Sequence, residues 1–422
     1  LNMRIFFKII KLLIKRFLSF LELFKFSYLL ELIFLFIFFI ATLPLAIQYQ
    51  SKKIKILFGV DPIINHIHWA NSLKNKVNRA DSVVHFDSDS FIAKAENYDF
   101  NIENFFFKLP KTYNKRLLVL SSIINSIFIY YRYNFFWISF NGGPLNRSLL
   151  GKYEIIWMKI CRKKIIVHPF GSDSYEYSLL NDKSLQHVLL TSQGHHLKDQ
   201  KKIKRNKSLF FKYLDSYPAT FQDNFIPRWD FVRPSFLTTD LTKFYGEKSY
   251  DKEIITIVHA PNHKGFKGTK FIETAIDSLK SKGYKINFIL VQGMEHKDLI
   301  NLLKDKADIL IDQLIFNGYA MSAIEGMAAG IPVISNLENS DTVTFFKRFS
   351  FLKECPIYSA NPESIEDKLE ELIKSEALRK EIGEKGKLYV EKFHSYEAVS
   401  SDILLLLDGI LKNKNYLNHH FK

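Results

Sequence analysis

The chain alternates short apolar runs with amphipathic stretches, and its first apolar run is unlike the others. This run extends from Phe26 to Ile47, and Glu31 is its only charged residue. At 1.5 Å per residue, a helix over this segment would be long enough to cross the ~30 Å hydrocarbon layer of a bilayer. Basic residues recur among apolar ones upstream of it. We expect residues 1–50 to form a membrane-associated segment, with a spanning helix favoured over a monotopic hairpin or an interfacial helix.

Downstream of this segment, apolar runs of strand length are followed by amphipathic helical patterns, which predicts an α/β protein. The first part of the chain has strand patterns at 54–60, 82–86, 136–140 and 164–168, and a helical pattern over 66–77. After a polar stretch at 240–253, strand patterns at 254–259, 286–291 and 309–312 alternate with helical ones over 270–281, 296–305 and 321–329. We expect two Rossmann-like domains, residues 51–245 and 246–395, with a cleft between them and a C-terminal helix and tail at 396–422.

The amino-acid composition limits the kinds of partner that the protein is expected to bind. With 47% hydrophobic and 24% charged residues the chain is neither fibrous nor disordered. Its formal net charge of +15 suits a polyanion, either an anionic membrane surface or nucleic acid. The basic residues are dispersed and no nucleic-acid recognition motif is present, so the membrane surface is the expected partner. The two cysteines, Cys161 and Cys355, form no metal-ligand or disulfide pattern, which indicates a reducing compartment.

The segment from Gly318 to Ser335 is dense in small residues and contains one carboxylate, Glu325. A helix over 321–329 would begin just beyond a strand, so its free N–H groups and positive dipole end would face the crevice at the sheet edge. Glu325 lies about one turn inside, where it can accept two hydrogen bonds from vicinal hydroxyls such as those of a ribose. The neighbouring Ala and Gly residues allow close backbone packing. The alternative is an ordinary glutamate on a helix surface.

The sequence IEGMAAGIPVIS, 324–335, resembles the donor-binding signature of GT-B glycosyltransferases of the retaining family 4 type, the glycosyl transferases group 1. The resemblance implies that Glu325 holds the ribose of a nucleotide-sugar. The first glutamate of the family signature falls at Asn317, and the glycine three residues beyond it is replaced by Ala320. Asn317 and Gly318 are therefore candidate donor contacts at a position where this chain departs from the family.

The loop HAPNHKGFKGT, 259–269, is similar to the diphosphate-binding loop of the same family. Lys267 and Gly268 match its Lys-Gly pair, and Lys264 or His263 stands near its other basic position. A fixed ammonium beside a helix N-terminus would stabilise the charge that develops on a diphosphate leaving group. The alternative is a solvated Lys-Gly turn. The segment around Met294 also resembles the family strand and loop that border the nucleobase.

In the first domain, KIIVHPFGSDSY, 164–175, resembles the loop that approaches the acceptor and the transferred sugar. His168 and Asp173 are the candidate catalytic residues there, as hydroxyl ligands or proton carriers. The alternative is a histidine that ends a strand and an aspartate that caps a helix. Asp87 and Asp89 follow a strand as metal-binding acids do in GT-A enzymes, but no GT-A pattern surrounds them, so we expect a polar turn. We predict no cofactor and no catalytic metal.

Together these features predict a membrane-associated glycosyltransferase of the hexosyltransferase type, with its catalytic domains in the cytoplasm. It would move a sugar from a nucleotide-sugar to a glycan or lipid-linked acceptor of the cell envelope, in polysaccharide biosynthesis. One alternative is a catalytically altered GT-B protein that acts as a membrane-bound assembly partner. The other is a nucleotide-sugar epimerase, which would need acid and base carboxylates in the cleft.

Overall fold

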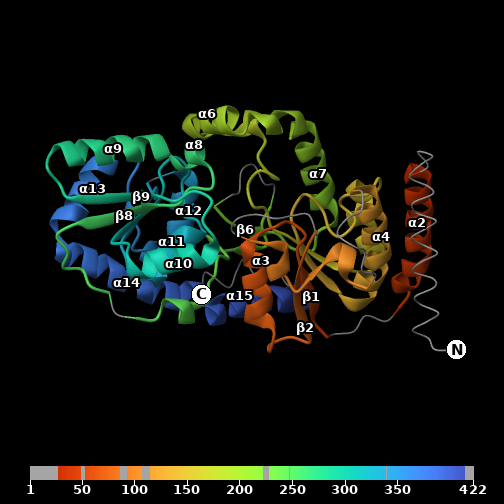
Figure 1. The fold of residues 1–422 in the computed structure, drawn as a ribbon. Helices are drawn as coiled ribbons and strands as arrows, with labels where there is room; N and C mark the ends of the chain where they lie inside the picture. Colours follow the sequence, from red (N-terminus) through yellow and green to blue (C-terminus); the bar gives the residue numbers. More distant parts are fainter. Residues whose placement is uncertain are drawn as a thin grey trace.

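Two parallel β-sheets form the framework of the molecule (Figure 1). The computed structural model of the chain describes residues 27–48, 53–85, 93–106, 115–221, 228–246, 248–338 and 340–413. The first sheet contains β1 (Lys55–Phe58), β2 (Arg79–Val84), β3 (Phe100–Asn101), β4 (Phe135–Ile138) and β5 (Lys164–Val167). The second contains β8 (Ile255–His259), β9 (Ile286–Leu290), β10 (Ile309–Gln313), β11 (Val333–Ser335) and β12 (Tyr358–Ser359). The short pair β6 (Pro218–Ala219) and β7 (Phe231–Val232) lies between them in sequence.

For description, β1 to β7 and their helices are called the first domain, and β8 to α14 the second domain. The helices that precede or lie within the first domain are α2 (Ser27–Thr42), α3 (Ile64–Leu73), α4 (Lys115–Arg132), α5 (Glu154–Ile160), α6 (Lys183–Ser192) and α7 (Gln200–Tyr213). Those of the second domain are α8 (Lys264–Lys267), α9 (Thr269–Ser281), α10 (His296–Asp305), α11 (Met321–Ala328), α12 (Asp341–Phe349), α13 (Ile365–Lys374) and α14 (Glu376–His394), and the chain continues into α15 (Tyr396–Lys412).

The strand orders identify where each sheet can bind a ligand. The first sheet has the order β3-β2-β1-β4-β5 and the second β12-β11-β10-β8-β9. The order reverses between β1 and β4 in the first sheet, and between β8 and β10 in the second. In parallel α/β sheets, ligands bind in the crevice beyond the carboxyl ends of the strands at such reversals. The α/β class expected from the sequence is confirmed. The reversal in the second sheet lies at a loop that we expected to carry the site, whereas the loop expected to do so in the first domain follows β5 at the edge of its sheet.

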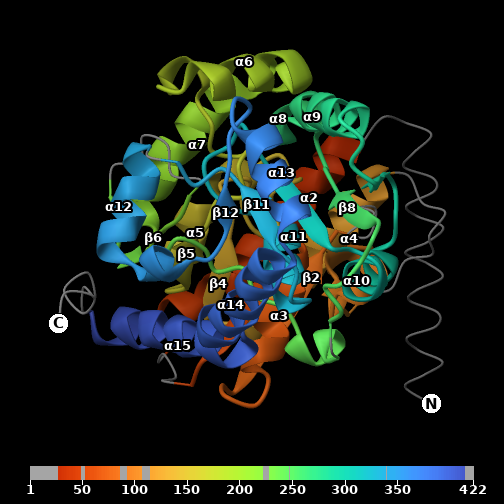
Figure 2. The same ribbon diagram turned by 90° about the vertical axis from the view of Figure 1, so that its left-hand side faces the viewer.

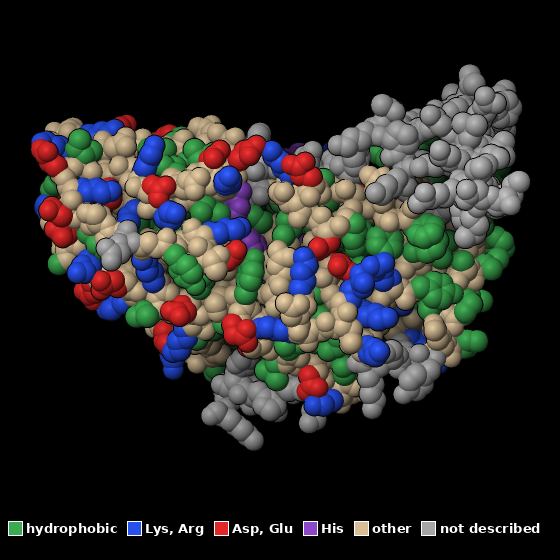
Figure 3. All heavy atoms as spheres, turned by 60° about the horizontal axis from the view of Figure 1, so that its bottom comes forward, with side chains coloured by type: hydrophobic (Ala, Val, Ile, Leu, Met, Phe, Trp, Pro, Cys, Tyr) green, Lys and Arg blue, Asp and Glu red, His purple; other side chains and the backbone are tan. Residues whose placement is uncertain are grey.

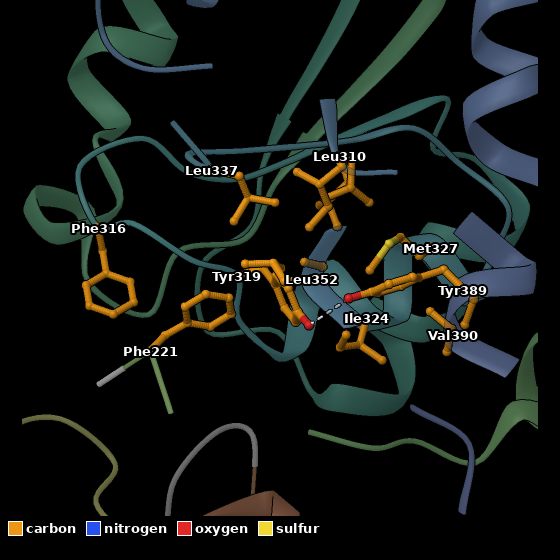
Figure 4. Packing of buried hydrophobic residues seen from close by; sticks show 14 of the residues in the cluster. Phe221, Leu310, Phe316, Tyr319, Ile324, Met327, Leu337, Leu352, Tyr389 and Val390 are labelled. Carbon is orange, nitrogen blue, oxygen red and sulfur yellow. Dashed lines mark hydrogen bonds between the residues drawn. The ribbon is translucent and has the colours of Figure 1, made fainter. Parts of the chain in front are cut away.

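Small residues bring α11 close to the second sheet. A Cβ atom added to Gly326 would lie 2.6 Å from Leu310 Cδ2 of β10, so only glycine permits this separation of helix and strand. On its other side α11 packs against α14, where Met327 and Ile324 belong to one buried cluster with Tyr389 (Figure 4). The small-residue run therefore holds the helix tightly between a sheet and a second helix.

The last helix returns to the first domain. Figures 1 and 2 show α14 and α15 running along one side of the molecule, from the second domain to α3. Ile403 and Leu407 of α15 share a buried cluster with Trp69 of α3 and Phe58 of β1. His68 Nδ1 lies 2.7 Å from the Tyr396 hydroxyl, which fixes the start of α15. The chain thus crosses between the domains twice, before β8 and after α14.

The first domain extends an arm, residues 183–213, over the second. It consists of α6, the 3₁₀ helix η6 (Gly194–Asp199) and α7. Figure 1 shows α6 reaching from α7 across to α8. The sequence pattern predicted only short irregular elements after residue 207, whereas α7 continues to Tyr213. Its buried face consists of Ile203, Asn206, Lys207 and Phe210. Because two of these four residues are polar, the apolar residues alone do not repeat at helical spacing.

Helix α2 packs along α4 at the edge of the first domain. Tyr28–Ala46 is long and apolar enough to cross a membrane by length and composition, and about a third of it is buried against the protein. Glu31 lies in this buried face, accepts a 2.6 Å hydrogen bond from Leu149 N and pairs with Arg116 at 3.4 Å. The opposite face is apolar and exposed. Hydrophobic side chains gather at this end of the molecule in Figure 3.

Candidate active site

A pocket of about 380 Å³ lies between the two domains, at the carboxyl ends of both sheets. The first domain contributes His66 of α3 and His168, which follows β5. The second domain contributes Lys267 of α8, and Ala320 and Met321 at the start of α11. Pockets of this size hold small molecules, and the position agrees with the strand reversals described above.

The lining of this pocket favours an anion. Apart from two tyrosines, Tyr175 and Tyr319, its ionisable groups among the residues that the structure describes are one lysine and five histidines, and no aspartate or glutamate is among them. These groups are Lys267, His66, His168, His195, His196 and His263. A lining with an ammonium and no carboxylate attracts a negatively charged ligand and would repel a cation.

Lys267 is held rigidly at the base of the pocket. Its Nζ lies 2.7 Å from Asp312 Oδ1 and 2.7 Å from Gln313 Oε1, and both side chains of the Lys267–Asp312 pair are almost fully buried. Asp312 also accepts hydrogen bonds from Ala320 N at 2.7 Å and Ser322 Oγ at 2.8 Å. One carboxylate at the end of β10 therefore ties the ammonium to the N-terminus of α11, so that two positive elements face the same space.

Glu325 does not line this pocket. It is 1% exposed, and its Oε1 lies 2.5 Å from His296 Nε2, at the start of α10. Nearby, Glu295 forms a 2.6 Å ion pair with Lys94 of the first domain. The part of the cleft beside Glu325 is thus closed by one contact within the second domain and one between domains.

The remaining second-domain candidates divide between the pocket and its surroundings. His263 lines the pocket, whereas Lys264 is exposed and outside its lining. Gly268 ends α8 in the left-handed conformation, with φ of 78°, which glycine adopts without strain. Met294 is partly buried against the second-domain core. None of these three outlying residues is in contact with the pocket.

The two residues at the position of the family's first glutamate also lie outside the lining. Asn317 is half-buried, and Gly318 packs so closely on Phe221 that an added Cβ would lie 2.9 Å from that ring. Phe221 belongs to the segment that joins the domains, and it meets Tyr319 edge to face (Figure 4). The pocket is lined instead by Tyr319 and Ala320, the next residues along the chain.

His168 faces the pocket as a neutral imidazole. Its ring lies among Trp69, Trp137 and Phe236, and its Nε2 is buried without a hydrogen-bond partner in the described structure. Burial, and then the nearby His66, lower the pKa of His168 to about 3. An unpartnered ring nitrogen at a pocket wall can bind a ligand hydroxyl, but a group with this pKa does not carry a proton near neutrality.

Asp173 binds backbone groups of its own domain rather than facing the pocket. Its carboxylate accepts hydrogen bonds from the backbone N–H groups of Phe140, Phe170 and Gly171 at 3.0–3.1 Å, and it does not line the pocket. Burial, followed by the charge of Asp61, raises the pKa of Asp173 to about 7. Asp173 therefore holds the backbone of the loop after β5, and residues 171–174 form a turn rather than the helix of the alternative interpretation.

Three elements of the site were missed by sequence reasoning. Asp61 accepts hydrogen bonds from Ser139 Oγ at 2.5 Å and Asn141 Nδ2 at 3.0 Å, at the strand reversal of the first sheet. His66 lines the pocket, and burial lowers its pKa to about 4. The pair His195–His196 comes from the arm. The Asp-Pro turn after the first strand is a sequence signal for Asp61 and His66. No local sequence pattern points to the two arm histidines.

No group of three or more His, Cys, Asp or Glu side chains in the described part of the chain is arranged to hold a metal ion. Asp87 and Asp89 lie outside the described residues. Metal independence stays a prediction.

Residues 268–389 match the family model described as Glycosyl transferases group 1. The chain therefore carries a domain of this glycosyltransferase group, and the matched segment contains Asp312, the start of α11 and Glu325. No curated protein sequence matches the chain.

Several solved structures resemble it distantly. The glycosyltransferase SnogD from Streptomyces nogalater is 12% identical with a TM-score of 0.38, over 84% of this chain and 100% of that one. A mutant O-GlcNAc transferase from Thermobaculum terrenum is 8% identical with a TM-score of 0.48, over 86% and 68%. MurG from Acinetobacter baumannii is 9% identical with a TM-score of 0.38, over 85% and 99%. None of these likenesses is close enough to bear on function.

Proposed function

We propose that the protein transfers a sugar from a nucleotide-sugar to a glycan or lipid-linked acceptor at a membrane surface. The observation that carries this proposal is the buried Lys267, fixed by Asp312 beside the start of α11. This pair borders a pocket whose described lining contains no carboxylate. The family match of residues 268–389 supports the transferase class.

In the proposed reaction the bond between the anomeric carbon and the diphosphate oxygen breaks, and the acceptor oxygen bonds to that carbon on the same face. The acceptor proton passes to the departing diphosphate, which leaves with the nucleoside. Lys267 and the N-terminus of α11 would stabilise the charge on that diphosphate. His168 would hold a sugar or acceptor hydroxyl through its unpartnered Nε2, rather than act as a base, because its pKa is too low.

In this proposal Glu325 remains the ribose ligand, but binding of the ribose requires one additional step. Because His296 contacts its carboxylate in this structure, a ribose diol would have to displace the imidazole. The Lys94–Glu295 ion pair across the same side of the cleft would open or rearrange at the same time.

We further propose that α2 lies within a membrane surface rather than across the bilayer. Its contacts with the first domain include a 2.7 Å hydrogen bond from Tyr131 OH to Ala41 O and a 2.9 Å bond from Trp157 Nε1 to Thr42 Oγ1. The buried Glu31 binds the domain at the other end. A spanning helix would leave this domain surface, and Glu31, in hydrocarbon.

The exposed face of α2 is suited to lipid. Its large side chains are 45–64% exposed and recur at helical spacing without a charged residue, and they are Leu29, Leu32, Ile33, Phe36, Ile37 and Ile40. The surplus of positive charge on the chain would add attraction to anionic lipids. With α2 at the interface, the first domain would be the half that meets a membrane-bound acceptor.

The proposal is tested by incubating the purified full chain with a panel of nucleotide-sugars and with membranes that contain lipid-linked glycans. We expect release of a nucleoside diphosphate and a matching mass increase of the acceptor, both lost in Lys267→Met. If no nucleotide-sugar is turned over although one binds, the assembly-partner alternative replaces the enzyme. The epimerase alternative is not favoured, since the described pocket lining lacks the paired carboxylates it needs.

A further inference from the structure

We infer that His195 and His196, on the arm of the first domain, form the second wall of the diphosphate site, opposite His263 and Lys267. The inference deepens the proposed function and rests on it. The family resemblance places phosphate-binding residues only on the second-domain loop, whereas this wall comes from a separate part of the chain.

The arm is held against the phosphate loop by close packing. Helix α6 ends at Ser192, and a Cβ atom added to Gly265 of α8 would lie 3.0 Å from Ser192 Cβ. The two backbones can approach this closely because position 265 has no side chain. His195 and His196 follow Ser192 in η6, so they emerge where the arm meets the second domain.

The two imidazoles face the same space as the second-domain cations. Both line the pocket together with His263 and Lys267. Their ring centroids lie 4.0 Å apart, and His196 Nδ1 is 3.6 Å from Asp199 Oδ2. At 3.6 Å this contact is too long for a hydrogen bond, so Asp199 is a neighbour of His196 at the pocket.

Residues of both walls influence the pKa of His263. Burial lowers the pKa of His263, and the nearby Lys267, His195 and His196 lower it further. Groups from both domains are therefore close enough to repel one another. An anion placed among them would relieve this repulsion, and the more charge it carries, the larger the gain.

A diphosphate fits this arrangement better than a neutral or singly charged ligand. It presents several oxygens in two directions, and the pocket is lined by donor side chains from both domains. Lys267 is buried at the base, His196 is half-buried, and His195 and His263 are at the mouth. A nucleoside diphosphate would thus be gripped by both domains.

The test compares His195→Gln/His196→Gln with His187→Gln in the full chain. His187 is exposed on α6 of the same arm and does not line the pocket. Binding is titrated calorimetrically with ADP, GDP, UDP and dTDP, with the parent nucleosides, and with inorganic diphosphate. For the nucleoside diphosphate that binds the wild type, we expect the double variant to lose roughly tenfold in affinity, the scale of hydrogen bonds to a charged group.

We expect inorganic diphosphate to show the same loss, the nucleoside to be unaffected, and His187→Gln to behave as wild type. Equal binding by the double variant, while Lys267→Met binds more weakly, would overturn the inference and leave the proposed function standing. An equal loss for nucleoside and nucleoside diphosphate would also overturn it, because the effect would not concern phosphate. A wild-type protein that binds no nucleoside diphosphate would reject both proposals.

Discussion

His296 Nε2 contacts Glu325 Oε1 at 2.5 Å, so the carboxylate expected to hold a ribose already has a protein partner in this structure. The two residues come from neighbouring helices, α10 and α11, and Glu325 is 1% exposed. A ligand that needs this carboxylate competes with an imidazole rather than with water. Nucleotide affinity should therefore depend on both residues, in opposite directions.

Glu325→Ala should weaken nucleotide binding by about 1 to 3 kcal/mol, because it removes a charged hydrogen-bond acceptor from the ribose. Calorimetric titration with the nucleotide that binds the wild type measures this change. Inorganic diphosphate should bind the variant normally, since it lacks a ribose. Unchanged nucleotide affinity in a folded variant would remove Glu325 from the site.

His296→Ala should strengthen nucleotide binding several-fold, because the ribose no longer has to displace the imidazole. Asn301→Ala, at an exposed position of the same helix, is the matched control. Both variants are titrated under identical conditions. A weaker affinity for His296→Ala would assign the histidine to the ligand rather than to the closed state.

Asp312→Asn should destabilise the protein by about 3 to 5 kcal/mol, because it leaves the buried Lys267 ammonium without its counter-charge. Lys267→Met combined with Asp312→Asn should recover part of that loss, since neither charge is then buried alone. Urea denaturation of the single and double variants measures the coupling. The double variant should still not bind a nucleoside diphosphate, so a recovery of binding would contradict the role given to Lys267.

Stability should respond to pH through His394, which is fully buried between Leu237 O at 2.7 Å and Tyr319 OH at 3.1 Å. Burial, and then the charge of Arg233, lower the pKa of His394 to about 3. Its unfolded pKa is about 6.5, so below that pH the unfolded chain takes up a proton that the folded one does not. The contribution of His394 to stability is therefore present above pH ~6.5 and declines as the pH falls toward the folded value.

The substitution His394→Gln removes this pH-dependent contribution to the free energy of unfolding. Between pH 7.5 and 4.5, the free energy of unfolding of wild type minus that of the variant should fall by about 2 to 3 kcal/mol. Denaturation curves of both proteins at the two pH values give this difference directly. A constant difference would mean that His394 is protonated equally in both states.

Membrane binding should depend on the exposed face of α2. Phe36→Ser/Ile37→Ser/Ile40→Ser should reduce sedimentation with anionic vesicles by more than about a hundredfold, as each buried apolar side chain contributes ~1.5 to 3 kcal/mol. The melting temperature should change little, because all three side chains are about half exposed or more. Leu388→Ser, on the exposed side of α14, is the control. Undiminished vesicle binding would place the membrane contact elsewhere.

The second domain could be predicted closely from its sequence because each element there carries its own signal. Strands β8, β9 and β10 are apolar runs between polar segments, and their observed bounds lie within one residue of the predicted ones. The first domain was harder to predict. Helix α4 buries Ser121, Ser122, Asn125 and Ser126, so its buried face is partly polar and the helical period is blurred. The second strand, expected at 82–86, is β2 at Arg79–Val84, since its edge begins with charged residues.

In the candidate site, too, some features could be predicted from the sequence and others could not. The position of Lys267 at the pocket follows from a local motif, and so does the place of α11. Whether a side chain is free or paired depends on residues far away in sequence, as with His296 and Glu325. The two arm histidines illustrate the same limit, because they reach His263 only through the packing of α6 on α8.

The return of α15 to the first domain has a consequence for how such a protein can be divided or recombined. Ile403 and Leu407 help to complete the core around Trp69, so the second domain cannot be exchanged by cutting at the crossing before β8 alone. A functional chimera would keep α15 with the first domain and take only the intervening segment from a relative. The second domain is therefore an insertion within the first rather than a terminal module.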